Sequence, residues 1–270
     1  MTRAAALLDA MLGTCRRDLA IFRTYPMRPL SLLFSQVVSL TLFFYISRLV
    51  GAREFASSQS YYAWVVIGMV TLAVLTSCLA TPVLQLRQEI LTGTFERFVL
   101  SPFGPVRGVL SLMVFPLLLA YATSLFTIAF AGVVFGLRLH WATAGIAIPI
   151  ALLGAVSFAP FGLLMATGTI LFKQTRGGTT FAITLVTVIS GIYFPTVLLP
   201  HWLHWLVEIQ PFTPAVELLR HELIGWPLTE SVTVSLVKLV LFPAVMMPLM
   251  AWLLASAIEL SRRRGTIVEY

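Results

Sequence analysis

The sequence predicts an all-α integral membrane protein, and three observations carry that prediction. Of the 270 residues, 59% are hydrophobic and only 11% are charged, whereas charged residues make up about 25% of a typical soluble domain. The mean hydropathy is +0.93. Six apolar runs are long enough to cross a bilayer, which takes about 20 residues in a helix: 30–50, 61–82, 107–137, 144–172, 178–199 and 231–258. We therefore expect six transmembrane helices in a single domain, 1–270, because no linker or internal repeat divides the chain.

Basic residues are distributed unequally between the loops, and this gives the expected orientation. Thirteen of the 18 Lys and Arg residues fall in the N-terminal segment, the second and fourth loops and the C-terminal segment. Four fall on the other side, namely Arg48, Arg53, Arg138 and Arg220, and Lys238 lies inside the last apolar run. Cytoplasmic loops carry the excess of Lys and Arg in membrane proteins, so we expect both termini in the cytoplasm. The net charge is +7, but in a membrane protein the sidedness of the basic residues matters more than their sum, so we expect no nucleic-acid partner.

Residues 1–29 precede the first apolar run and combine an apolar stripe with basic residues. The stripe has i, i+3, i+4, i+7 spacing and consists of Leu8, Met11, Leu12, Cys15, Leu19 and Phe22. Arg16, Arg17 and Arg23 lie off this stripe. The pattern predicts an amphipathic helix on the inner leaflet. The alternative is a disordered tail, which a stripe sustained over four turns disfavours.

The stretch LRQEILTGTFERFVLSPFGPVRG, residues 86–108, lies between two apolar runs and is both charged and amphipathic. A loop that only joined two spans would need neither feature. Its apolar stripe, Ile90, Leu91, Phe95, Phe98 and Val99, keeps a helical spacing, so we expect a helix within 86–103. Residues three and four apart share a helix face, so Glu89, Gly93 and Glu96 are expected to form one continuous edge.

The third and fourth apolar runs exceed the length that a bilayer requires, and both contain proline. Pro116 lies in the third run, and Pro149 and Pro160 lie in the fourth. Proline removes a helical hydrogen bond and its ring clashes with the preceding turn. Tilt, kinks or an end outside the hydrocarbon are therefore expected in these two runs.

Small hydroxylated residues follow one face of two predicted spans. Ser31, Ser35 and Ser39 share a face of the first span, and Thr180, Thr184 and Thr187 share a face of the fifth. Such faces favour close helix–helix packing in membranes. The alternative is that they line a translocation path, and both interpretations are compatible at a subunit interface.

The segment 191–227 is apolar but is interrupted by four prolines, at Pro195, Pro200, Pro211 and Pro214. It cannot supply a single further crossing, because that would place the two termini on opposite sides of the membrane. We expect two short helices within 200–227 that dip into the outer leaflet without crossing it.

The chain shows no motif for driving transport by itself. It lacks the G-x-x-x-x-G-K-[ST] sequence that binds nucleotide phosphates, and a plain interhelical turn accounts for Gly177 and Gly178. Lys238 is the candidate ionisable residue at membrane depth, and it can snorkel outward from the first turns of its span. The energy for transport is therefore expected to come from another chain.

An enzyme embedded in the membrane is the rival class. His201, His204 and Glu208 share one helical face and could suit a metal ion, but an interfacial helix with its polar face in water accounts for them as well. The chain has no G-x-S-x-G sequence, and the serines inside spans have no histidine nearby. We expect no catalytic residues, metal or cofactor in this chain.

Three motifs occur in order along the chain: E-x-x-x-G-T-x-E-R from Glu89, GIYFPTVLLPHWL from Gly191, and PFTPAVELLRHELIG from Pro211. Together with the six-span count and the N-terminal helix, they make the chain resemble the permease subunits of type 2 ATP-binding-cassette exporters. The GTFERFVLSP form looks closest to the drug and lipo-oligosaccharide export branch. The resemblance covers nearly the whole chain.

The resemblance implies a core of two permease copies, expected to be a homodimer, with two ATPase subunits below it. It also implies re-entrant outer helices and a cytoplasmic coupling helix, Arg87 to Leu100, that docks in a cleft of the ATPase. In that helix the apolar stripe would pack on the spans and Gly93 would allow close approach to the ATPase. The residues that match this coupling role are Arg87, Glu89, Gly93, Thr94, Glu96 and Arg97. ATP and Mg²⁺ are then expected in the partner subunit.

The function implied is ATP-driven export of amphipathic or hydrophobic, drug-like or lipid-like molecules across a bacterial inner membrane. One alternative is an exporter of lipid-linked glycans or polysaccharides. An alternative from another class is a self-contained channel or secondary carrier, which would be active without a nucleotide-binding partner.

Overall fold

The structure of the 270-residue chain is a computed structural model that describes residues 3–25, 27–49, 58–95, 104–140, 142–172, 176–192, 196 and 199–264. Every regular element in these ranges is a helix, which confirms the all-α prediction for the described part of the chain. The elements are α1 (Arg3–Thr24), α2 (Met27–Leu49), α3 (Ser58–Leu91), α5 (Pro105–Leu112), α6 (Val114–Phe135), α7 (Ala144–Phe172), α8 (Arg176–Ile189), η2 (His201–Leu203), α9 (His204–Ile209), α10 (Phe212–Ile224) and α11 (Val232–Arg263).

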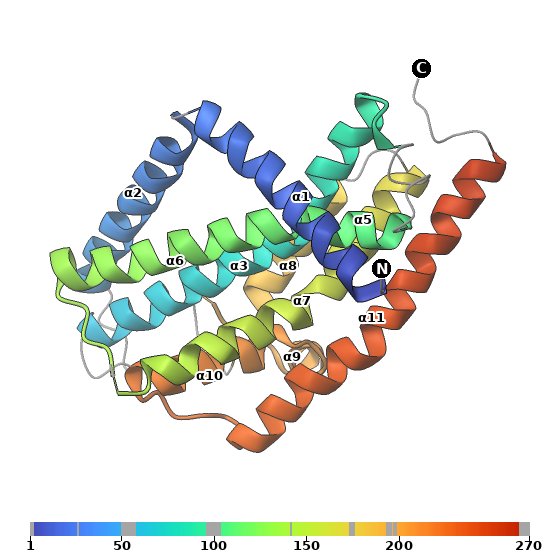
Figure 1. Ribbon diagram of the computed structural model, residues 1–270. Helices are drawn as coiled ribbons and strands as arrows, with labels where there is room; N and C mark the ends of the chain where they lie inside the picture. The colour runs from blue at the N-terminus through green and yellow to red at the C-terminus, as the bar shows by residue number, and fades with distance from the viewer. Residues whose placement is uncertain are drawn as a thin grey trace.

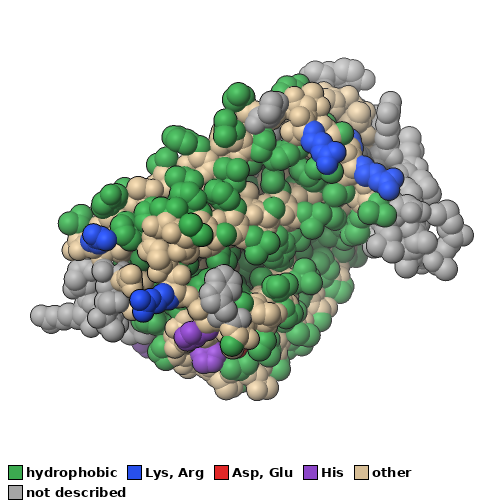
Figure 2. Space-filling model, turned by 60° about the vertical axis from the view of Figure 1, so that its left-hand side comes forward, with side chains coloured by type: hydrophobic (Ala, Val, Ile, Leu, Met, Phe, Trp, Pro, Cys, Tyr) green, Lys and Arg blue, Asp and Glu red, His purple; other side chains and the backbone are tan. Residues whose placement is uncertain are grey.

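Within the described residues, five helical spans are long and apolar enough to cross a membrane: Pro29–Leu49, Gln59–Leu91, Pro105–Phe135, Ala144–Phe172 and Val232–Arg263. This is a multi-pass membrane protein. Hydrophobic side chains cover most of the face in Figure 2, and Lys and Arg lie toward its two ends. This distribution suits a body that crosses hydrocarbon.

The predicted crossing at 178–199 corresponds to a shorter helix. Helix α8 has 14 residues, about 21 Å at 1.5 Å per residue, whereas the hydrocarbon core is about 30 Å thick. The described helix ends just before Gly191, whose φ of 69° is left-handed. The sixth crossing therefore stays a prediction.

Helices α3 and α7 form the centre of the bundle, and α2 and α11 lie at its edge. The candidate span in α3 is 61% buried and that in α7 is 50% buried, but the values for α2 and α11 are 11% and 17%. Helix α3 contacts α2, α6, α7, α8 and α10. Figure 1 shows α3, α6 and α7 running side by side.

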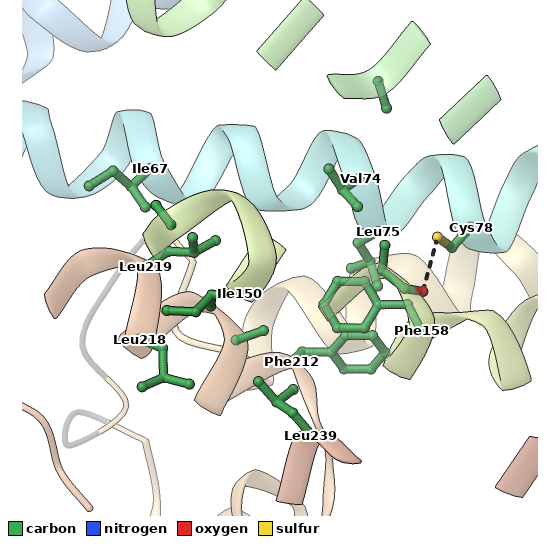
Figure 3. Packing of buried hydrophobic residues seen from close by; sticks show 14 of the residues in the cluster. Ile67, Val74, Leu75, Cys78, Ile150, Phe158, Phe212, Leu218, Leu219 and Leu239 are labelled. Atoms are coloured by element: carbon green, nitrogen blue, oxygen red, sulfur yellow. Dashed lines mark hydrogen bonds between the residues drawn. The ribbon is translucent and has the colours of Figure 1, made fainter. Parts of the chain in front are cut away.

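Glycines on α7 permit close packing at this centre. A Cβ built at Gly162 would lie 2.2 Å from the carbonyl oxygen of Cys78, and one at Gly154 would lie 3.3 Å from the Cβ of Ala215. The backbone of α7 therefore approaches α3 at one glycine and α10 at the other. Figure 3 shows the apolar core that results, with Phe158 and Phe212 in ring contact at 4.6 Å between centroids.

The prolines act differently in the two long runs. The third run divides at Met113 into α5 and α6, three residues before Pro116. Pro116 has no N–H to donate to the carbonyl of Leu112, which is where α5 ends. Helix α7 instead continues through Pro149 and Pro160. Of the two runs in which proline was expected to cause kinks, only the third is interrupted.

The segment before the first span and the segment 200–227 both contain helices, as the sequence predicts. Helix α1 packs across α5 and α6 (Figure 1), where the rings of Phe22 and Phe115 lie 5.8 Å apart. Helices α9 and α10 occupy the predicted range 200–227. How these helices sit against the bilayer stays a prediction.

Candidate functional site

The predicted coupling segment begins as the last turns of α3. Arg87 and Glu89 belong to α3, which ends at Leu91. Gly93 has a φ of 70°, a conformation that glycine adopts without steric cost, and the Thr94 amide donates to the Glu89 carbonyl at 3.0 Å. This left-handed turn is a common way to end a helix.

The expectation of one helix from Arg87 to Leu100 is therefore wrong. The chain changes direction at Gly93, so Glu89 and Gly93 do not continue one helical edge toward Glu96. Glu96 and Arg97 lie outside the described residues, and the assignment of all six coupling residues to an ATPase contact stays a prediction.

The carboxylate of Glu89 lies between α1 and the turn at 92–95. One oxygen accepts a hydrogen bond from Arg17 Nη1 at 2.7 Å, and the other accepts from the Thr94 hydroxyl. The Glu89 side chain is 12% exposed, against 41% for Arg17. Glu89 thus fastens the turn to α1 and presents little surface to a partner.

Further contacts extend this attachment. Arg17 Nε donates to Asp18 at 3.0 Å, and the amide of Gln85 on α3 donates to the other Asp18 oxygen at 3.4 Å. The Thr14 hydroxyl contacts the carbonyl of Ser111 at 3.2 Å. Helix α1 is therefore tied to the end of α3 and to α5 by polar contacts.

Beyond Gly93 the chain is anchored by an apolar side chain. Phe95 is 3% exposed and packs in a cluster with Leu86, Val109 and Leu254, which come from α3, α5 and α11. Of the other described residues of the apolar stripe, Ile90 packs against this cluster and Leu91 is 61% exposed. Thr92 and Gly93 between the two anchors are exposed, and a Cβ built at Gly93 meets nothing within 4 Å.

The hydroxylated faces of α2 and α8 point outward to different degrees. Ser31, Ser35, Thr180 and Thr184 are exposed, whereas Ser39 and Thr187 are half-buried. The Thr187 hydroxyl donates to the Ile183 carbonyl of its own helix at 2.6 Å. Whether these faces meet a second copy or line a path stays a prediction.

The histidines at η2 and α9 form a loose pair. The rings of His201 and His204 lie 5.6 Å apart, and His204 Nε2 is 3.1 Å from the Leu199 carbonyl oxygen. No group of three His, Cys, Asp or Glu side chains among the described residues is arranged to hold a metal ion.

Arg220 on α10 is a buried cation that the sequence analysis counted among the loop charges. It is 3% exposed. Its Nη1 and Nη2 donate to the carbonyls of Gly191 and Ile192, each at 2.9 Å, and its Nε donates to the Trp64 carbonyl at 3.3 Å. The guanidinium carbon lies 3.3 Å from the centroid of the Trp64 ring, within cation–π range.

These contacts join α10 to α3 and to the chain just after α8. Gly68 on α3 makes room for them, since a Cβ there would lie 2.4 Å from the Ile192 carbonyl oxygen and 3.0 Å from Arg220 Nη2. We call Arg220, Trp64, Gly68, Gly191 and Ile192 the arginine clamp. It satisfies carbonyls that the end of α8 leaves without helical partners.

The guanidinium keeps its charge in this site. Burial lowers the pKa of Arg220, and the negative charge of Glu217, one turn earlier on α10, partly counteracts that effect. Arginine starts from a pKa above about 12, so it stays protonated. The sequence held a signal for this position, because Val216, Arg220 and Leu223 at i, i+4 and i+7 place the arginine on the apolar stripe of α10.

Lys238, the candidate charge at membrane depth, reaches back toward the start of α11. Its ammonium donates to Glu230 at 2.6 Å, and its side chain is 32% exposed. The side chain thus points along α11 toward its N-terminal end; whether this brings the ammonium out of the hydrocarbon stays a prediction.

A family comparison now identifies the class of protein. The sequence model of the ABC-2 type transporter matches residues 11–224, from α1 to the end of α10. The chain belongs to the ABC-2 type transporter family. It is thus a permease subunit of an ABC transporter, and such a permease implies an ATPase partner. The chain matches none of the curated proteins with which it was compared. The assignment to the drug and lipo-oligosaccharide branch stays a prediction.

Proposed function

We propose that this ABC-2 permease exports amphipathic or hydrophobic molecules, drug-like or lipid-like, outward from the cytoplasm or the inner leaflet. A separate ATPase subunit binds ATP and Mg²⁺ and supplies the energy, and this chain carries no catalytic residue of its own. Two permease copies and two ATPase copies form the complex, in a bacterial inner membrane with both permease termini cytoplasmic.

The observation that supports this most directly is the exposed turn at Thr92 and Gly93. It is fastened on one side by the Glu89–Arg17 ion pair and on the other by Phe95 in its apolar cluster. A protrusion held at both sides moves together with α1, α3 and α5, so a push on it from an ATPase reaches the spans as a rigid-body displacement.

A bulky substitution at this turn tests the proposal. Thr92→Trp enlarges an exposed residue beside Gly93, and Thr233→Trp enlarges an exposed residue at the start of α11 as a control. Co-expressed with its ATPase, the Thr92→Trp permease should retain about tenfold less ATPase on purification, which corresponds to about 1.4 kcal/mol of binding free energy.

Substrate-stimulated ATP hydrolysis and export should fall together with ATPase retention, and the Thr233→Trp control should match the wild type in all three. Undiminished ATPase retention and export in Thr92→Trp would contradict the proposed docking surface. Glu96→Lys, which reverses a charge of the same segment, should give the same loss, because like charges at an interface weaken it.

A further inference from the structure

A cavity of about 180 Å³ lies between α9, α10, the loop at 229–230 and the start of α11. Three carboxylates line it, those of Glu208, Glu217 and Glu230, together with Lys238. Thr213 and Ser235 contribute hydroxyl groups to the same walls. The cavity is separate from the turn at Thr92 and from the arginine clamp.

The lining carries an excess of negative charge. Lys238 pairs with Glu230 at 2.6 Å, so these two charges largely cancel. Neither Glu208 nor Glu217 forms an ion pair within the described part of the chain. Arg220 offsets part of the Glu217 charge, but its own hydrogen bonds all go to backbone carbonyls of the clamp.

Two deeply buried hydroxyls on the walls have hydrogen-bonding capacity to spare. Ser235 is 1% exposed, and its hydroxyl bonds to no other residue that the structure describes. Thr213 is 6% exposed; its oxygen accepts from the Gln210 amide at 2.8 Å, which leaves its own proton to donate. Buried polar groups are normally hydrogen-bonded, so these hydroxyls point to a polar occupant.

One carboxylate is already held in place at the rim. The Thr229 hydroxyl donates to Glu217 Oε1 at 2.8 Å, and no described residue donates to Oε2. Glu217 is therefore oriented, with one oxygen left to accept a hydrogen bond from a ligand. A charge-assisted bond of this kind is stronger than one between neutral groups.

We propose that this cavity binds the cationic head group, an ammonium, of an amphipathic molecule that the transporter carries. This rests on the proposed function, which supplies the amphipathic substrate. An apolar cavity of about 150 Å³ holds benzene, so an ammonium with short substituents fits in the space present. The two carboxylates attract a cation and repel an anionic head group of the same size.

Helix α9, which supplies His204, Val207 and Glu208 to the cavity wall, and the adjoining η2 also carry exposed apolar residues outside that wall. Trp202, Trp205 and Ile209 on η2 and α9 are each more than half exposed. An apolar tail attached to an ammonium in the cavity can lie along these side chains. The aromatic rings also suit the boundary between a polar head and an apolar chain.

The experiment measures binding to the purified full-length permease in nanodiscs, without ATPase or ATP. The probes are a fluorescent dodecylammonium and the same chain with a sulfonate head, and methylammonium, which keeps the N–H donors, serves as a head-only competitor. We expect the ammonium probe to bind more tightly than the sulfonate, and methylammonium to displace it. Displacement by methylammonium locates the selectivity in the head group; failure to displace a bound ammonium probe would overturn the proposal.

Variants place the binding in the cavity. Glu208→Gln and Glu217→Gln should each weaken binding of the ammonium probe about tenfold, the effect of losing one hydrogen bond to a charged group. Glu259→Gln, an exposed carboxylate near the end of α11, is the matched control and should leave binding unchanged. Because Glu208 is exposed, its variant folds even where Glu217→Gln does not.

Equal affinity for the two probes, or unchanged ammonium binding in Glu208→Gln, overturns this inference. The assay contains no ATPase, so its result is independent of the proposed export. Selective ammonium binding without ATP-driven transport would leave the cavity assignment standing and contradict the proposed function. ATP-driven export of amphiphiles without ammonium selectivity would support the proposed function and contradict the cavity assignment.

Discussion

Arg17 and Arg220 carry the same charge but lie in opposite kinds of surroundings. Arg17 is 41% exposed and pairs with two carboxylates, those of Asp18 and Glu89. Arg220 is 3% exposed and bonds to three backbone carbonyls, with the Trp64 ring against its face. An exposed ion pair contributes about 0–1 kcal/mol because water screens it.

A buried cation contributes more to stability, because water cannot reach the groups that it bonds to when the cation is removed. Removing Arg220 leaves the Gly191 and Ile192 carbonyls without donors, and each buried unsatisfied group costs about 1–3 kcal/mol. The arginine clamp therefore stabilises the fold. The Arg17–Glu89 pair contributes little stability and instead positions the turn at Thr92.

The largest expected effect is the loss of the clamp. Arg220→Ala should destabilise the permease by about 3–5 kcal/mol, since it removes three hydrogen bonds and a buried charge to which the site is fitted. Arg138→Ala, at an exposed arginine after α6, is the control and should change stability little. Thermal unfolding of the detergent-solubilised protein, followed by tryptophan fluorescence, measures both. Similar small losses in the two variants would show that Arg220 is not structurally important.

The next effect comes from filling the space beside the clamp. Gly68→Ala places a Cβ 2.4 Å from the Ile192 carbonyl oxygen, so α3 and the chain after α8 must separate, at a cost of about 1–3 kcal/mol. Gly132→Ala is the matched change, because its Cβ meets only one atom, at 3.9 Å. Alanine in a helix is favoured over glycine by about 0.5–1 kcal/mol, so Gly132→Ala should stabilise slightly. The same unfolding assay compares them, and equal shifts of both variants would refute close packing at Gly68.

The smallest effect is expected at the exposed pair. Arg17→Met and Glu89→Gln should each lower the free energy of unfolding by about 1 kcal/mol or less, as for other partly exposed ion pairs. A double-mutant cycle in the same assay isolates their interaction. A coupling energy of 3 kcal/mol or more, as large as the Arg220 effect, would remove the distinction between the two arginines.

Much of the fold could be predicted from the sequence, because composition and helical period depend on the bilayer and on local geometry. The all-α class, five of the spans, the helix at the N-terminus and the two short helices within 200–227 follow from apolar run length, stripe spacing and proline positions. Proline alone did not mark the run that breaks, since the helix is interrupted before Pro116 but α7 continues through Pro149 and Pro160.

The details of the candidate site depended on tertiary contacts and could not be predicted from the sequence. Glu89 was expected on an edge facing the ATPase, but its carboxylate forms an ion pair with Arg17, which lies 72 residues earlier in the chain. Gly93 was expected to allow close approach within a helix, but its left-handed φ ends the helix. Arg220 was counted as a loop charge, because counting charges by loop ignores which face of α10 a residue occupies.

The proposed function requires that this chain transport amphiphiles only together with an ATPase. Everted membrane vesicles containing the permease, the ATPase or both test this requirement, with uptake of a fluorescent amphiphile as the readout. We expect uptake only when both chains and hydrolysable ATP are present, and none with a non-hydrolysable analogue. Equal uptake in vesicles that contain the permease alone would contradict it and identify a self-contained channel or carrier.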